Sequence, residues 1–105
     1  MAKAEELART FLTYLQRGDF SGAHQLFAPS MKLACPLVFL EDLWRRAEAR
    51  IGTLRSYDKI EVIPNALYEV ILVDCEFARG TYGCRLAFQD GQIVSLYMDD
   101  RIFAV

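Results

Sequence analysis

The chain has 105 residues, 53% of them hydrophobic, and its 12 lysine and arginine residues against 14 aspartate and glutamate residues give a formal charge of −2. This length and composition predict a single domain over residues 1–105 that can fold without a metal ion or disulfide bonds. The balanced charge, without a run of lysine or arginine, argues against a nucleic-acid partner.

The sequence also argues against insertion into a membrane. No apolar run approaches the about 18 residues of a membrane-spanning helix, and Glu5 and Glu6 stand where a signal peptide would be apolar. We therefore expect a cytoplasmic protein with no membrane partner.

The cysteines and the single histidine carry no motif of a metal site. The number of cysteines is odd, and none of the three, Cys35, Cys75 and Cys84, has Cys-x-x-Cys spacing. This pattern favours reduced thiols in the core. We expect no metal and no cofactor. A nucleophile and base pair of Cys35 with His24 stays possible, although the sequence does not bring the two side chains together.

Three helices are expected in the first half of the chain. Apolar residues recur at helical spacing over residues 3–17, and Asp19 can cap a second helix that ends before Pro29. Residues 30–33 should form only a short helical turn. The longest periodic run follows over residues 40–51.

From about residue 54 the hydrophobic period changes to two, which predicts strands. The expected strands cover residues 55–63, 68–77, 81–89 and 92–99. The second is apolar on both faces for much of its length, so it should be central in its sheet. We expect an α+β domain in which three N-terminal helices pack on a curved four-stranded antiparallel sheet.

Two tight turns set the expected register of the sheet. A hairpin centred on residues 79–80 places Cys75 opposite Cys84, and a hairpin centred on residues 90–91 places Cys84 opposite Tyr97. In this register the inner face is apolar at one end and polar at the other.

Several short motifs together resemble a known family. They are Gly18-Asp19-Phe20, Leu26-Phe27, Leu43-Trp44, Asp90-Gly91-Gln92-Ile93 and Leu96-Tyr97. This combination resembles number 3887 in the domain-of-unknown-function series, and through it the nuclear-transport-factor-2-like superfamily, which includes SnoaL-like cyclases and ketosteroid isomerases. The resemblance covers nearly the whole chain and implies a cone-shaped, cystatin-like fold. Its motifs are packing signatures, so they imply no particular chemistry.

The inside of the cone is the expected site for a small apolar ligand. Its lining residues would be Tyr14, Trp44, Cys75, Tyr82, Cys84 and Tyr97. The alternative is that these side chains simply fill the core.

An enzyme is an alternative that the resemblance suggests. Enzymes of the superfamily carry a carboxylate or a tyrosine in the mouth of the cone, which makes Asp99, Asp58 and Tyr97 the candidates for acid–base work of an isomerase, cyclase or hydrolase. Asp99 lies near the end of the sequence, where carboxylates commonly sit in water, so no catalytic residue is assigned.

The outer face of the sheet is the expected association surface. It gathers the apolar residues Tyr68, Val70, Leu72, Ala87, Val94 and Leu96. Contiguous exposed apolar patches usually mark interfaces, so we expect a homodimer through this face, with residues 102–105 or a foreign protein as alternative covers. The expected function is a non-catalytic ligand-binding or association module. The alternatives are the enzyme and an accessory domain that docks on a separate protein.

Overall fold

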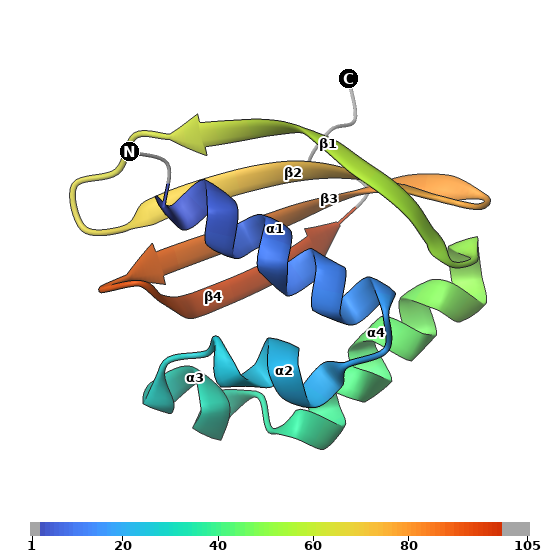
Figure 1. Cartoon of the computed structure of the whole chain (residues 1–105), viewed down its shortest axis with the longest axis horizontal. Coiled ribbons are helices and arrows are strands. Elements are labelled where there is room, and N and C mark those ends of the chain that lie inside the picture. The colour runs from blue at the N-terminus through green and yellow to red at the C-terminus, as the bar shows by residue number, and fades with distance from the viewer. Residues whose placement is uncertain (1–2, 100–105) are drawn as a thin grey trace.

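The computed structural model describes residues 3–99, in which four helices precede four strands (Figure 1). The helices are α1 (Lys3–Gln16), α2 (Phe20–Gln25), α3 (Pro29–Ala34) and α4 (Leu37–Ile51). The strands are β1 (Leu54–Ile63), β2 (Glu69–Phe77), β3 (Gly80–Gln89) and β4 (Gln92–Asp99). The α+β class is confirmed, with one helix more than expected because α3 forms a separate six-residue helix.

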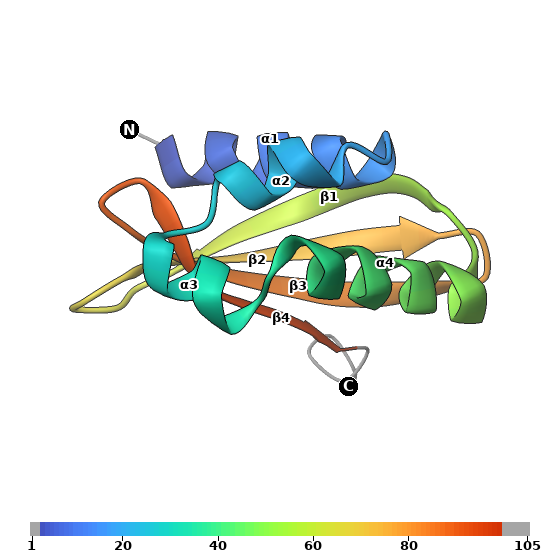
Figure 2. The same ribbon diagram turned by 90° about the horizontal axis from the view of Figure 1, so that it is seen from below.

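The strands form one antiparallel, unclosed sheet in the order β1-β2-β3-β4. Helix α1 covers one face of this sheet, here called the inner face, while α3 and α4 lie beside the β4 edge (Figures 1 and 2). Within residues 3–99 no helix covers the opposite, outer face. No helix in this range is long and apolar enough to cross a bilayer.

Local sequence signals explain where α1 and α2 begin and end. The buried residues of α1 include Phe11, Leu12 and Leu15, at the spacing that turns one helix face toward the sheet. Gly18 then adopts a φ of +77°, and the Asp19 carboxylate accepts a hydrogen bond from the backbone N–H of Gly22 at 2.9 Å. The expected Asp19 cap is confirmed.

The core lies between α1, α4 and the inner face of the sheet. In β2 the side chains of Ile71, Val73, Cys75 and Phe77 are buried in strict alternation. Trp44 of α4 is 1% exposed, and its ring centroid lies 5.4 Å from that of Phe77. The interpretation of β2 as a central strand is confirmed.

The expected register between β2 and β3 is wrong by two residues. Phe77 pairs with Gly80, so the turn is Ala78-Arg79, and Cys84 lies opposite Val73 instead of Cys75. A shift of two residues keeps every side chain on its face, so the inner residues were still identified correctly.

Contacts with the end of α4 explain the position of this turn. The backbone N–H of Arg79 donates to the Ile51 carbonyl at 2.6 Å, and that of Ala78 donates to the Thr53 carbonyl at 3.0 Å. A Cβ at Gly80 would lie 3.2 Å from Ile51 Cγ2, so this glycine permits close packing on α4 instead of supplying the turn.

The expected register between β3 and β4 holds only at the turn. Phe88 pairs with Ile93 as expected, but an irregularity follows, and Leu86 then pairs with Leu96 and Arg85 with Tyr97. This one-residue bulge moves every later side chain of β4 to the other face. Leu96 therefore packs against the core, and Tyr97 lies on the outer face.

Contacts at the edge of the sheet, with a segment distant in the sequence, explain the bulge. Ile93 donates its backbone N–H to the Leu26 carbonyl at 2.9 Å, and its carbonyl accepts from Ala28 at 2.8 Å. Phe27 thereby forms an isolated parallel bridge with Ile93. The segment before α3 thus fixes the first part of β4 in a position that the hairpin turn alone does not determine.

Candidate functional site

The expected ligand-lining residues divide between the core and the two faces of the sheet. Trp44, Cys75 and Cys84 are at most 1% exposed and pack in the core. Tyr14 and Tyr82 are half-buried against that core. The sixth residue, Tyr97, lies on the outer face because of the β4 bulge.

The catalytic candidates lie on the outer face and on different strands. Asp58 of β1 is exposed and pairs with Asp74, whose neighbours Val73 and Cys75 both point to the core. Tyr97 of β4 is 42% exposed, and the Arg85 guanidinium lies 5.5 Å from its ring centroid. Two strands separate β1 from β4, which places them about 14 Å apart.

The backbone of Asp99 pairs with Gly83 at the end of β4, and its side chain lies outside the described part of the structure. The outer face also holds Asp74, a carboxylate that the sequence did not single out. Its Oδ1 is buried and has no hydrogen-bond partner among residues 3–99. No group of acidic, cysteine and histidine side chains within this range could hold a metal ion.

His24 and Cys35 are neighbours, but not in the geometry of a nucleophile and its base. His24 Nε2 lies 3.0 Å from the Cys35 backbone carbonyl oxygen, which can only accept a hydrogen bond, and the His24 ring centroid lies 5.2 Å from that of Phe27 in a tilted arrangement. Burial raises the pKa of the Cys35 thiol, which disfavours the reactive thiolate. The contact joins α2 to the loop after α3.

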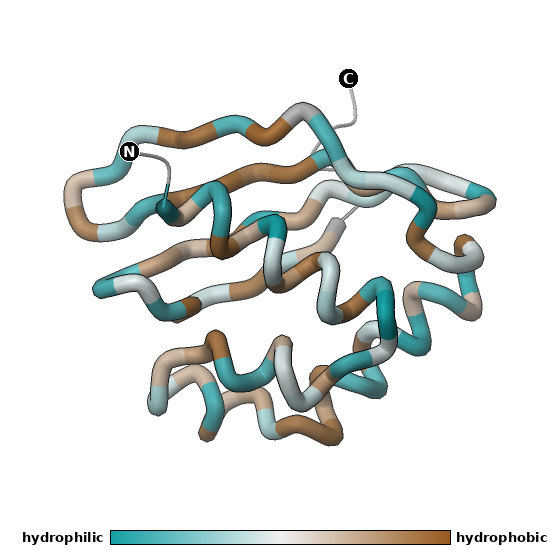
Figure 3. Tube along the Cα trace, in the orientation of Figure 1, coloured by the Kyte–Doolittle hydropathy of each residue, from teal (hydrophilic) through white to brown (hydrophobic). Residues whose placement is uncertain are grey.

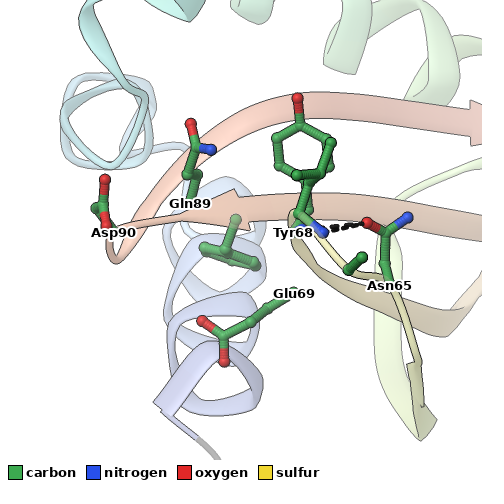
Figure 4. Close-up of a pocket in the computed structure, with 8 residues that line it drawn as sticks. Asn65, Tyr68, Glu69, Gln89 and Asp90 are labelled. Atoms are coloured by element: carbon green, nitrogen blue, oxygen red, sulfur yellow. Dashed lines mark hydrogen bonds between the residues drawn. The ribbon is translucent and has the colours of Figure 1, made fainter.

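A polar pocket of about 330 Å³ lies where the β1–β2 loop meets the β3–β4 turn (Figure 4). The Asn65 side-chain oxygen shapes its rim by accepting the backbone N–H groups of Leu67 at 2.9 Å and Tyr68 at 3.1 Å. The carboxylates of Glu69 and Asp90 point in different directions and do not converge on a common point (Figure 4). The pocket therefore lacks a charged centre that could orient a ligand.

Most of the exposed large apolar side chains within residues 3–99 lie on the helices. We call this cluster the α3–α4 surface, and it consists of Leu33 (85% exposed), Leu37 (39%), Val38 (66%), Phe39 (61%) and Leu43 (41%). The apolar residues continue from α3 into the first turn of α4, at the corner of the molecule far from β1 (Figure 3). A groove of about 350 Å³ opens beside them, lined by Cys35, Phe39, Asp42, Leu43 and Arg46.

A second groove, of about 240 Å³, separates α4 from the edge of the sheet. We call it the α4–β4 groove, and its lining is Leu43, Arg46, Ala47, Arg50, Tyr82 and Met98. Its floor is apolar, and its two arginines come from α4. Met98 lies there because the bulge turns it to the inner face.

The sequence held a signal for the α3–α4 surface that was missed. Residues 37–40 are four consecutive apolar residues at the start of a helix, and a helix can bury only one side of such a run. Leu40 takes the core position at 1% exposed, which leaves the other three in solvent. Among the residues expected on the outer face of the sheet, Val70, Leu72, Ala87 and Val94 are half-buried, and Tyr68 is 38% exposed.

The comparisons with known proteins identify a family and no activity. The family described as "Protein of unknown function (DUF3887)" matches residues 8–96 of the chain. No curated protein and no solved structure matches the chain.

Proposed function

Because the chain belongs to the DUF3887 family, whose description assigns no activity, we propose its function from the geometry: it is an association module that binds a second copy of itself through the α3–α4 surface. The observation that carries the proposal is the exposure of Leu33, Val38 and Phe39, each more than half in solvent. Large apolar side chains gathered in this way usually mark an interface.

Self-association suits the shape and charge of this surface. It has projecting side chains next to a groove, so a two-fold axis can seat the projections of one copy in the groove of the other. The charged residues beside it are balanced within each copy, because Arg45 pairs with Glu41 at 2.9 Å and Arg46 with Asp42 at 2.7 Å. Two identical surfaces would therefore not repel each other.

The expected driving force is sufficient for a dimer. An apolar patch of about 300–600 Å² on each copy, at about 25 cal/mol per Å², gives about 15–30 kcal/mol of gross stabilisation. Association itself costs about 4–15 kcal/mol. A small apolar ligand in the same groove is the second candidate, since Phe39 and Leu43 form an apolar wall there.

We also propose two of the other features expected from the sequence. Helices on one face of an unclosed antiparallel sheet support a nuclear-transport-factor-2-like cone. Three free cysteines support a reducing, cytoplasmic compartment. We do not propose the enzyme expected as an alternative, because Asp58 and Tyr97 are exposed to water and lie on opposite edge strands.

The test compares the α3–α4 surface with an equally apolar residue elsewhere. Light scattering should show a dimer for the wild type at micromolar concentrations and a folded monomer for Phe39→Glu. Leu67→Glu is the matched control, since Leu67 is 71% exposed in the β1–β2 loop, and it should remain a dimer. Leu72→Arg tests the outer sheet face expected from the sequence.

Each outcome of this experiment decides between surfaces. A monomeric wild type, or a Phe39→Glu variant that still dimerises, contradicts the proposal. Loss of the dimer in Leu72→Arg alone would move the interface to the sheet. Alkylation gives an independent readout, because Cys35 is the only cysteine that is not buried, and dimer formation should slow its modification.

A further inference from the structure

We propose that the α4–β4 groove binds a small aromatic carboxylate, with the ring against Tyr82 and Met98 and the carboxylate on Arg50. The groove shares Leu43 with the α3–α4 surface, but binding there does not depend on the proposed dimer. Three observations carry the inference: a row of aromatic rings that ends at the groove, an apolar floor with room for a further ring, and a lining whose charged side chains are all arginines.

A row of aromatic rings leads from the core to the groove. The Trp44 ring centroid lies 5.4 Å from that of Phe77, and the Phe77 centroid lies 5.9 Å from that of Tyr82 in an edge-on arrangement. Trp44 and Phe77 are buried, whereas Tyr82 is half-buried and lines the groove. Aromatic pairs at such separations attract each other beyond the effect of burial, so a ring in the groove would extend the row.

The floor of the groove offers apolar contacts that suit a flat ring. Ala47 is the smallest side chain of the lining, and Leu43 beside it is 41% exposed. Met98 of β4 adds a thioether, which makes favourable contacts with aromatic rings. The groove volume of about 240 Å³ lies below the range of roughly 300–1,000 Å³ for drug-sized ligands, which favours an occupant with a single ring.

Both charged side chains that line the groove are arginines. Arg46 and Arg50 stand four residues apart on α4, so they lie on the same face of the helix and repel each other. Arg46 is paired with Asp42 at 2.7 Å, whereas Arg50 has no ion pair within residues 3–99. One unpaired guanidinium balances one negative charge, and a carboxylate accepts two parallel hydrogen bonds from it. A singly charged carboxylate therefore suits the groove better than a phosphate, which carries nearly two charges.

The test titrates phenylacetate into the full chain with isotope-labelled methionine methyl groups and follows their resonances by NMR. The aromatic ring of a bound ligand shifts the resonance of a methyl group beside it. Met98 lines the groove and should shift to saturation at millimolar phenylacetate. Met31 is the internal control, because it lies on α3 and does not line the groove, and its resonance should stay in place.

Two arginine variants locate the carboxylate in the same titration. Arg50→Gln should weaken phenylacetate binding by about fivefold or more, because it removes the charged partner of the carboxylate. Arg45→Gln is the matched control on the same helix. The Arg45 guanidinium pairs with Glu41, lies 5.3 Å from the Phe20 ring centroid and does not line the groove, so the affinity should stay unchanged. Both arginines are exposed, so both variants should fold.

Two relatives of phenylacetate separate the charge from the ring. Phenylacetamide is neutral and should bind about fivefold more weakly or less tightly still, whereas cyclohexylacetate lacks the aromatic ring and should bind about threefold more weakly. Equal affinities of phenylacetate and either relative would overturn the proposed ligand class. Equal losses in Arg50→Gln and Arg45→Gln would overturn the role of Arg50. A Met98 resonance that does not shift, or that shifts no more than Met31, would overturn the site itself.

Discussion

Replacing Trp44 tests how the core is filled, because this residue combines the largest buried side chain with an unpaired polar group. Trp44 is 1% exposed, packs its ring 5.4 Å from that of Phe77, and has no hydrogen-bond partner for Nε1 within residues 3–99. Trp44→Ala removes the ring and leaves a cavity, which should lower the free energy of unfolding by about 3–5 kcal/mol.

Trp44→Phe separates the packing from the polar group. Phenylalanine keeps part of the ring contact with Phe77 and removes the buried N–H, whose missing hydrogen bond costs about 1–3 kcal/mol. This relief offsets part of the lost packing, so the net loss for Trp44→Phe should stay below about 2 kcal/mol.

Urea denaturation followed by circular dichroism measures both variants on the same scale. A loss below about 1 kcal/mol for Trp44→Ala would show that the ring is not packed in the core. Equal losses for the two variants would show that the ring contact with Phe77 carries no stability of its own, because both variants lack the N–H and differ only in the ring.

Three further changes test the backbone, the thiols and the β4 register. Gly52→Ala should destabilise the fold by more than about 1 kcal/mol, and by more than Gly91→Ala does. Both glycines have a positive φ, but only at Gly52 would the new Cβ meet a neighbour, the Ala78 Cβ at 2.6 Å. Thermal melts of the two variants measure the difference. Burial raises the pKa of the Cys75 thiol to about 12. Because the unfolded chain loses this proton at a lower pH, the free energy of unfolding should fall between about pH 8.5 and pH 12. Cys75→Ala should reduce this fall. Leu96→Ser should lower the melting temperature more than Tyr97→Ser; the reverse order would restore the unbulged register.

The order of elements followed from the sequence because it depends on local signals. Helical spacing with the Asp19 cap marks the first two helices, and strict alternation marks β2. The two register errors arise where distant segments decide. The end of α4 at Ile51 fixes one turn, and the segment before α3 fixes Ile93, and neither contact leaves a pattern in the strands themselves.

The candidate site was harder to predict than the fold for a related reason. Five of the six expected ligand-lining residues lie in the core or pack against it, and the error for Tyr97 came entirely from the bulge. The α3–α4 surface was missed because an apolar run at a helix start reads as core in a sequence. Only the position of α4 beside the sheet edge, with Leu40 inward, shows that Val38 and Phe39 face solvent.

Helix α4 is attached to the molecule in different ways at its two ends. Its first turn carries Val38 and Phe39, while its last turn is bonded to the β2–β3 turn through the Ile51 carbonyl and Arg79. A helix of 15 residues is about 22 Å long and bends little. A single rigid element therefore holds the exposed first turn and the bonded last turn at a fixed separation, on either side of the buried Trp44.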